Sequence, residues 1–279
     1  MSPDGGGPAP AAVINDRAAA RLRAGHAWVY RTELLGFAGG EPAPGQPAAL
    51  RDRRGGELGW ADPSPLSQIA LRRLTSDPAT VVDPAFFRRR LEAALALRHD
   101  LRIEDTAYRL VAGEADGLPG WIADRYGSAV VIQTLSAAMD ARQPLLVDLL
   151  REALRPECIV ERNDAKIRKL EGLELRSGIV EGAPPSAHGE PGHAGTGRPA
   201  GSPAAQGADA SLVVATIGGL AYHFDLLGGQ KTGGFLDQRE NWAAVAAWAR
   251  PGIEALDAFC YQGGFALHLA RRGAQVTAA

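Results

Sequence analysis

A segment of 29 residues, 182–210, constrains the fold of this chain more than any other feature. Twenty of these residues are Gly, Ala or Pro, and none is Val, Ile, Leu, Met or aromatic. A segment without large apolar side chains cannot form a core, so we expect a flexible insertion or linker between folded parts. His188 and His193 lie in it without cysteines or carboxylates at metal-ligand spacing, so we expect no metal site there.

The N-terminal part of the chain predicts a small β-rich module over residues 13–80. Residues 1–12 are rich in Gly, Pro and Ala, which predicts a disordered tail. Short apolar runs then alternate with Gly, Pro and Asp up to about residue 74, a pattern typical of short strands separated by turns.

Residues 81–181 have the pattern of a separate α+β domain. Asp83 and Pro84 form a helix start, an N-cap followed by proline at the first helical position, and apolar residues then recur at helical spacing to about residue 98. A second helix is expected over residues 144–154. Strands are expected over 108–112, 122–123, 130–135 and 158–161, with a turn over 124–128 between the second and the third.

Residues 211–279 predict the start of an α/β domain. Two apolar runs, 212–217 and 220–226, flank Gly218 and Gly219, which indicates a hairpin. Asp237 and Glu240 have capping-box spacing, which predicts a helix from there to about residue 249.

A strand over 255–259, a glycine turn over 262–264 and a helix over 265–272 follow, and another parallel strand begins at 275–277. This order of elements opens a doubly wound nucleotide-binding sheet. Glycine lets the backbone approach a ligand closely, and the next helix offers free N–H groups. The spacing is not G-x-G-x-x-G, which disfavours a nicotinamide dinucleotide, and Lys231 resembles a P-loop lysine only superficially.

Composition excludes some classes of function. The chain has 30 Lys and Arg against 32 Asp and Glu, so it carries no overall basic charge for nucleic acid, and any RNA contact must be local. Cys158 and Cys260 match no disulfide framework and no metal spacing. The sequence shows neither a signal peptide nor the run of about 18 apolar residues that spans a membrane, so we expect a cytoplasmic protein without a membrane or metal partner.

Several segments together resemble a known family. Gly228–Arg239 has the sequence GGQKTGGFLDQR, and Asp257–Phe265, a short way downstream, has the sequence DAFCYQGGF. These segments resemble class I S-adenosylmethionine-dependent methyltransferases that modify large-subunit ribosomal RNA, the 5-methylcytosine-forming group with an N-terminal PUA domain. The upstream segments that are also similar to this family are Arg21–Tyr30, Gly113–Gly127, Glu161–Asp164 and Arg168–Glu174.

The resemblance implies a multidomain protein: a small β-rich PUA-like module, a central α+β domain and the start of an α/β Rossmann-like methyltransferase domain. It implies S-adenosyl-L-methionine as cofactor and ribosomal RNA as partner. The residues that it implies for the cofactor site are Asp257, Phe259, Gly263, Gly264, Lys231, Thr232, Phe235, Gln238 and Arg239, with Asp237 in the same loop. The residues that it implies for RNA binding are Arg21, Arg23, His26 and Trp28.

Methylation of carbon 5 of cytosine usually needs a thiolate that adds to carbon 6 of the flipped base. The resemblance implies that this cysteine lies beyond Ala279, so we expect a chain truncated at its C-terminus and inactive alone. Cys158 is expected to be buried, and Cys260 is a poor candidate for the nucleophile. An RNA-binding protein without catalysis, carrying a vestigial Rossmann-like segment, is the alternative, and a nucleotide-dependent oxidoreductase is a third.

Overall fold

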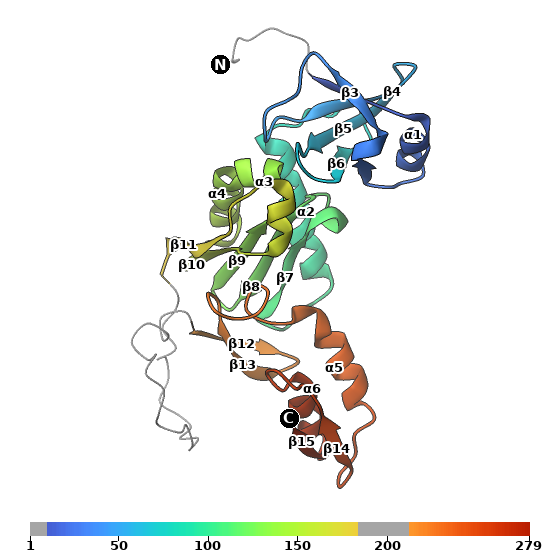
Figure 1. Ribbon diagram of the computed structural model, residues 1–279. Coiled ribbons are helices and arrows are strands. Elements are labelled where there is room, and N and C mark those ends of the chain that lie inside the picture. Colours follow the sequence, from blue (N-terminus) through green and yellow to red (C-terminus); the bar gives the residue numbers. More distant parts are fainter. Residues whose placement is uncertain (1–9, 184–211) are drawn as a thin grey trace.

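The computed structural model describes residues 10–183 and 212–279, which form three parts that follow one another along the long axis of the molecule (Figure 1). The predicted insertion with His188 and His193, and most of the predicted tail, lie outside the described residues.

The first part is a six-stranded sheet of strand order β2-β6-β5-β4-β1-β3 with one helix, α1 (Asp16–Arg23). Asn15 caps this helix, since its side chain accepts a hydrogen bond from the backbone N–H of Ala18 at 2.9 Å. The strands are β1 (Ala11–Ile14), β2 (Trp28–Tyr30), β3 (Leu34–Ala38), β4 (Ala48–Asp52), β5 (Glu57–Pro63) and β6 (Ile69–Thr75).

The prediction that residues 1–12 form a disordered tail was wrong at its C-terminal end. Ala11 and Ala12 lie in β1, which pairs antiparallel with β3 and parallel with β4, and both side chains are buried. Alanine is too small to mark a strand by its own hydrophobicity, so this strand is defined by long-range pairing that the local sequence does not show.

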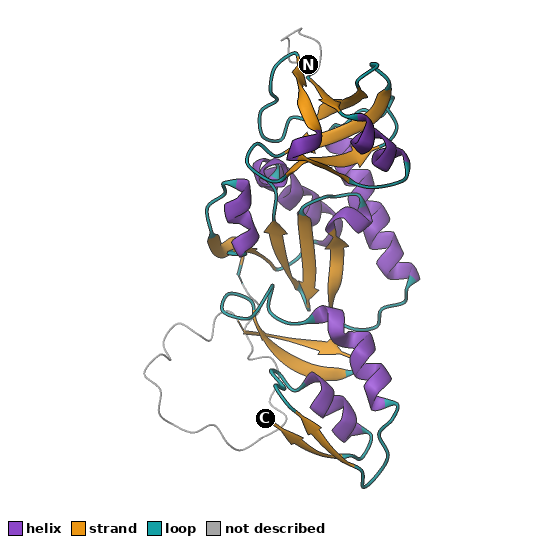
Figure 2. Cartoon of the chain, turned by 45° about the vertical axis from the view of Figure 1, so that its right-hand side comes forward, coloured by secondary structure: helices purple, strands orange, loops and turns teal. Residues whose placement is uncertain are grey.

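The second part is a mixed five-stranded sheet of order β11-β10-β9-β8-β7, in which only β9 and β10 run parallel. Asp83 caps α2 as predicted, accepting from the N–H of Phe86 at 2.8 Å. Helices α2 and α4 cover one face of this sheet with a shared apolar core (Figure 2). The elements are α2 (Pro84–Asp100), β7 (Ala107–Ala112), β8 (Trp121–Tyr126), β9 (Ala129–Thr134), α3 (Ala137–Ala141), α4 (Gln143–Leu154), β10 (Cys158–Asn163) and β11 (Arg176–Gly182).

One prediction for this part was wrong, and one strand was not predicted. Asp124 lies inside β8 and is fully buried, whereas a turn was expected from that residue onward. An aspartate in a strand is disfavoured by propensity, and it is tolerated here because Arg109 neutralises it across the ladder at 2.9 Å. Strand β11 was not predicted, since its side chains are largely exposed.

The third part begins with the predicted hairpin of β12 (Leu212–Ile217) and β13 (Leu220–Asp225). The hairpin packs on the face of the central sheet opposite α2 and α4, where Phe224 lies 4.8 Å from the ring of Tyr126. It is followed by α5 (Arg239–Ala246), β14 (Glu254–Asp257), α6 (Gly264–Arg271) and β15 (Gln275–Ala278), and β15 is parallel to β14 as predicted.

The predicted capping box at Asp237 and Glu240 does not form. Residues Leu236–Gln238 make a single 3₁₀ turn, and α5 begins at Arg239 without a side-chain cap. Asp237 lies inside this turn, and Gln238 occupies the N-cap position of α5. The Asp237 carboxylate lies 3.2 Å from the Lys231 ammonium instead. The strand expected over 255–259 ends at Asp257, so Phe259 lies in the following turn.

Buried ion pairs join the first part to the second. Arg142 of the central domain forms two hydrogen bonds of 2.6 Å with Asp62 of β5, and both side chains are buried. Arg72 of β6 lies 2.9 Å from Glu171, and this pair is buried as well. Since buried charges are costly unless paired, these contacts fix one orientation of the two domains.

Candidate cofactor site

A cavity of about 460 Å³ opens where β14 ends and α6 begins. The carboxyl ends of parallel strands, beside the N-terminus of the next helix, are where α/β sheets bind their ligands. The cavity is lined by Gln230, Phe235, Gln238, Trp242, Asp257, Ala258, Phe259, Cys260, Tyr261, Gln262, Gly264 and Phe265. Its walls therefore come from the loop after β13, from α5 and from the glycine turn.

The two glycines of the turn are required for different reasons. Gly263 has φ +74°, in the left-handed region, and caps α6. A Cβ atom on Gly264 would lie 2.3 Å from Cε2 of Trp242, so α5 packs directly on the turn. Asp257, at the end of β14, accepts a hydrogen bond from the N–H of Ala266 at 2.9 Å, which ties the strand to the first turn of α6.

Several non-glycine residues with left-handed backbone conformation lie at or beside this cavity. Five non-glycine residues of the described chain have positive φ, and Lys231, Phe259 and Tyr261 are three of them. Phe259 and Tyr261 line the cavity, and Lys231 follows Gln230, which also lines it. Left-handed backbone at residues with bulky side chains costs energy and is concentrated at functional sites.

The structure brings some of the predicted cofactor residues together and not others. Asp257, Phe259, Gly264, Phe235 and Gln238 line the cavity, and Gly263 completes its turn. The lining residues that were not among the predicted cofactor residues are Gln230, Trp242, Ala258, Cys260, Tyr261, Gln262 and Phe265. All of them except Trp242 lie within the two quoted motifs, and helical spacing alone did not show that Trp242 faces the turn.

Three predicted residues lie outside the cavity wall. The ammonium of Lys231 lies over the ring of Phe235 at 4.3 Å and beside Asp237. Arg239 pairs with Glu240 at 2.6 Å, and Thr232 is buried against the central domain with 1% of its surface exposed.

The predicted RNA-binding residues meet at the end of α1 and the start of β2. Arg21 donates to the carbonyl of Trp28 at 2.9 Å, and its guanidinium lies 4.9 Å from the ring of Tyr30. His26 contacts the backbone of Trp28 through Nδ1, and the Trp28 indole donates to Glu114 of the central domain at 3.0 Å. Arg23 pairs with Asp52 but keeps an exposed side chain.

The two cysteines lie in different environments. Cys158 is buried in β10 as predicted, and burial raises the pKa of its thiol. Cys260 lines the cofactor cavity and is partly exposed.

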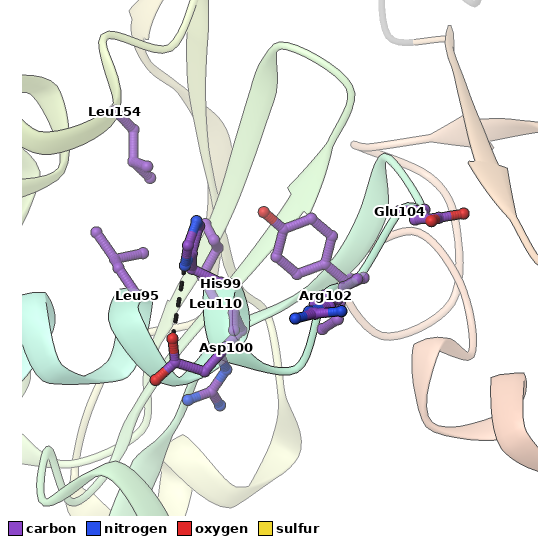
Figure 3. Close-up of a pocket in the computed structure, with 10 residues that line it drawn as sticks. Leu95, His99, Asp100, Arg102, Glu104, Leu110 and Leu154 are labelled. Carbon is purple, nitrogen blue, oxygen red and sulfur yellow. Dashed lines mark ion pairs between the residues drawn. The ribbon is translucent and has the colours of Figure 1, made fainter.

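A second cavity, of about 620 Å³, lies at the C-terminal end of α2 (Figure 3). His99 and Asp100 at its mouth are highly exposed and lie 3.6 Å apart, while Arg98 is held by Asp116 at 2.6 Å. It shares no residue with the cofactor cavity.

Across residues 10–183 and 212–279, no three His, Cys, Asp or Glu side chains are grouped as metal ligands, and none of the helices there is both long and apolar enough to cross a membrane.

Residues 13–76 match the PUA-like domain family. Two solved structures share the overall fold: a putative S-adenosylmethionine-dependent methyltransferase from Streptococcus mutans (TM-score 0.70, 18% identity, 95% of this chain and 62% of that one) and a putative methyltransferase complexed with SAH (TM-score 0.71, 18% identity, 95% and 61%). The fold is thus that of a PUA-like domain followed by a methyltransferase-like α/β domain.

Among curated proteins, the chain is similar to two that are named ribosomal RNA large subunit methyltransferase I. The protein from Photobacterium profundum is 36% identical over 256 residues, which cover 91% of this chain and 58% of that protein. The protein from Cronobacter sakazakii is 38% identical over 245 residues, which cover 87% and 55%. The chain therefore spans somewhat more than half the length of these relatives.

Proposed function

We propose that this protein is an S-adenosylmethionine-dependent methyltransferase of large-subunit ribosomal RNA. The observation that carries the proposal is the cavity built around Gly263 and Gly264 at the end of β14, in a chain that is similar to enzymes of that name.

The residues of the cavity fit this cofactor. Its volume of about 460 Å³ lies within the ~300–1,000 Å³ of typical small-molecule sites. The rings of Phe235 and Tyr261, at 5.2 Å and nearly perpendicular, provide apolar walls suited to a purine base. Gln238 and Asp257 add polar groups, and the bare backbone of Gly264 allows close approach.

S-adenosylmethionine supplies an electrophilic methyl group on a sulfonium centre. The role of the protein is to hold the cofactor against the glycine turn and to bring the RNA base within reach of the methyl group. We assign RNA docking to the end of α1, where the side chain of Arg23 is exposed and Trp28 links the PUA-like domain to the central domain.

Carbon 5 of cytosine is the target that we propose, on the strength of the motif resemblance. This reaction needs a thiolate nucleophile. We assign that role to neither cysteine, because Cys158 is buried in the central sheet and Cys260 lines the cavity that the cofactor itself would fill.

The test is transfer of a tritiated methyl group to ribosomal RNA by the protein expressed from its complete reading frame. We expect label in large-subunit RNA, in 5-methylcytosine after nuclease digestion. Label in another nucleotide would show that the proposed target base is wrong, while the proposal of an RNA methyltransferase would stand. RNA binding with neither methyl transfer nor SAH binding would instead establish the alternative, a non-catalytic RNA-binding protein.

A further inference from the structure

The loop between β13 and α5 is attached to the central domain by a short chain of buried hydrogen bonds. The hydroxyl of Thr232 lies 2.6 Å from a carboxylate oxygen of Asp124 and 2.9 Å from the phenol oxygen of Tyr126. Asp124 and Tyr126 both belong to β8, and no part of either side chain reaches solvent. Thr232 itself is 1% exposed.

The direction of these hydrogen bonds follows from the groups involved. The Asp124 carboxylate can only accept, so the Thr232 hydroxyl donates to it. The threonine oxygen then accepts from the Tyr126 phenol. Burial, with the nearby Asp124 charge, raises the pKa of Tyr126, so the phenol keeps its proton and remains a donor. Arg109 neutralises Asp124 through contacts of 2.9 and 3.2 Å, which stabilises the charged acceptor.

The backbone of the loop is closely packed on both sides of Thr232. A Cβ atom on Gly233 would lie 3.3 Å from the Tyr126 ring, and one on Gly229 would lie 2.4 Å from the carbonyl oxygen of Asp225. Gln230, two residues before Thr232, and Phe235, three residues after it, line the cofactor cavity instead. One loop therefore connects the buried strand β8 with the wall of the cavity.

We propose that Asp124 and Tyr126 of the central domain are positioning residues for the cofactor site and act through Thr232, which anchors the loop and does not contact the cofactor. This inference rests on the proposed function. Loss of the Thr232 hydroxyl would leave Asp124 with an unfilled acceptor and free the loop, so that Gln230 and Phe235 no longer hold their places in the wall.

The experiment compares Thr232→Val, which keeps the shape and removes the hydroxyl, with Thr232→Ser, which keeps the hydroxyl. Binding of SAH is measured by calorimetry on the protein expressed from its complete reading frame. We expect Thr232→Val to raise the Kd about tenfold, the size of effect expected for a lost buried hydrogen bond, and Thr232→Ser to restore binding. Amide hydrogen exchange over residues 228–235 is expected to accelerate only in the valine variant.

Asp116→Asn is the matched control. Asp116 is also a buried central-domain carboxylate paired with an arginine, Arg98 at 2.6 Å, but it does not touch the loop. We expect this variant to lower the melting temperature without changing the Kd for SAH, which separates positioning from general loss of stability.

The outcomes distinguish the two proposals. If the wild-type protein does not bind SAH, the proposed function fails and this inference with it. If the wild-type protein binds SAH and Thr232→Val binds equally well, the inference is overturned while the proposed function stands. A valine variant that loses affinity to the same extent as Asp116→Asn, with equal loop exchange, also overturns it.

Discussion

The pair of Asp62 and Arg142 gives the sharpest test of how the two N-terminal domains are held together. The guanidinium forms two bonds of 2.6 Å with the carboxylate, donates to the carbonyl of Gly45 at 2.7 Å and lies 4.6 Å from the ring of Phe87. Only 9% of the Arg142 side chain and 2% of the Asp62 side chain are exposed. Arg142→Ala therefore leaves a buried carboxylate without its ion-pair partner, with only the weaker influence of the Arg72 charge remaining.

Removal of one member of a buried ion pair costs ~3–5 kcal/mol. At about 4 °C per kcal/mol for a small domain, the lower limit predicts that the melting temperature falls by roughly 12 °C. The assay is thermal unfolding by circular dichroism. Replacement of both residues, Asp62→Leu with Arg142→Met, is expected to recover most of the loss, because no buried charge remains. Arg88→Ala, which breaks the exposed pair with Glu152, is the control and should change little.

The pH dependence of Arg142→Ala follows from the same site. Burial raises the pKa of Asp62 above its usual 3.8, and Arg142 opposes that shift. Without the arginine, the folded state takes up a proton at higher pH than the unfolded state. The deficit is therefore largest at neutral pH and shrinks as the pH falls toward 3.8. A deficit that is below about 1 kcal/mol, or that is independent of pH, would refute this account of the pair.

Three further predictions concern the site and its surroundings. Gly264→Ala puts a methyl group 2.3 Å from the indole that packs on the turn, so we expect SAH binding to fall at least about tenfold by calorimetry; an unchanged Kd would remove the turn from the site. Arg21→Glu with Arg23→Glu is expected to weaken binding to ribosomal RNA and to flatten its salt dependence in filter-binding assays, whereas an unchanged slope would exclude this pair from the interface. Burial raises the pKa of the Cys158 thiol, so Cys260 should react first with a thiol reagent at neutral pH in the folded protein, and equal rates would contradict the structure.

Some elements of the fold could be predicted because their signals are local. The cap at Asp83, the proline after it and the apolar spacing of α2 lie within a few residues, and the helix begins where they place it. Gly218 and Gly219 likewise define the hairpin of β12 and β13, because both have the positive φ that its tight turn requires.

Other elements depend on partners that are distant in the sequence. Ala11 and Ala12 form a strand because β3 and β4 pair with it. Asp124 is tolerated in a buried strand because Arg109 balances its charge and Thr232 donates a hydrogen bond to it. Asp237 does not cap α5, because the chain forms a 3₁₀ turn there and the helix begins two residues later; its carboxylate pairs with Lys231 of the same loop.

The kind of site follows from local sequence. A strand, a glycine turn and a helix place backbone N–H groups where a ligand can approach, and this arrangement requires only neighbouring residues. Which residues of the loop Gly228–Arg239 face the cavity was decided by tertiary structure alone. Thr232 turns toward the central sheet and Phe235 toward the cavity, because a buried carboxylate 108 residues upstream holds the threonine, and no local pattern records that contact.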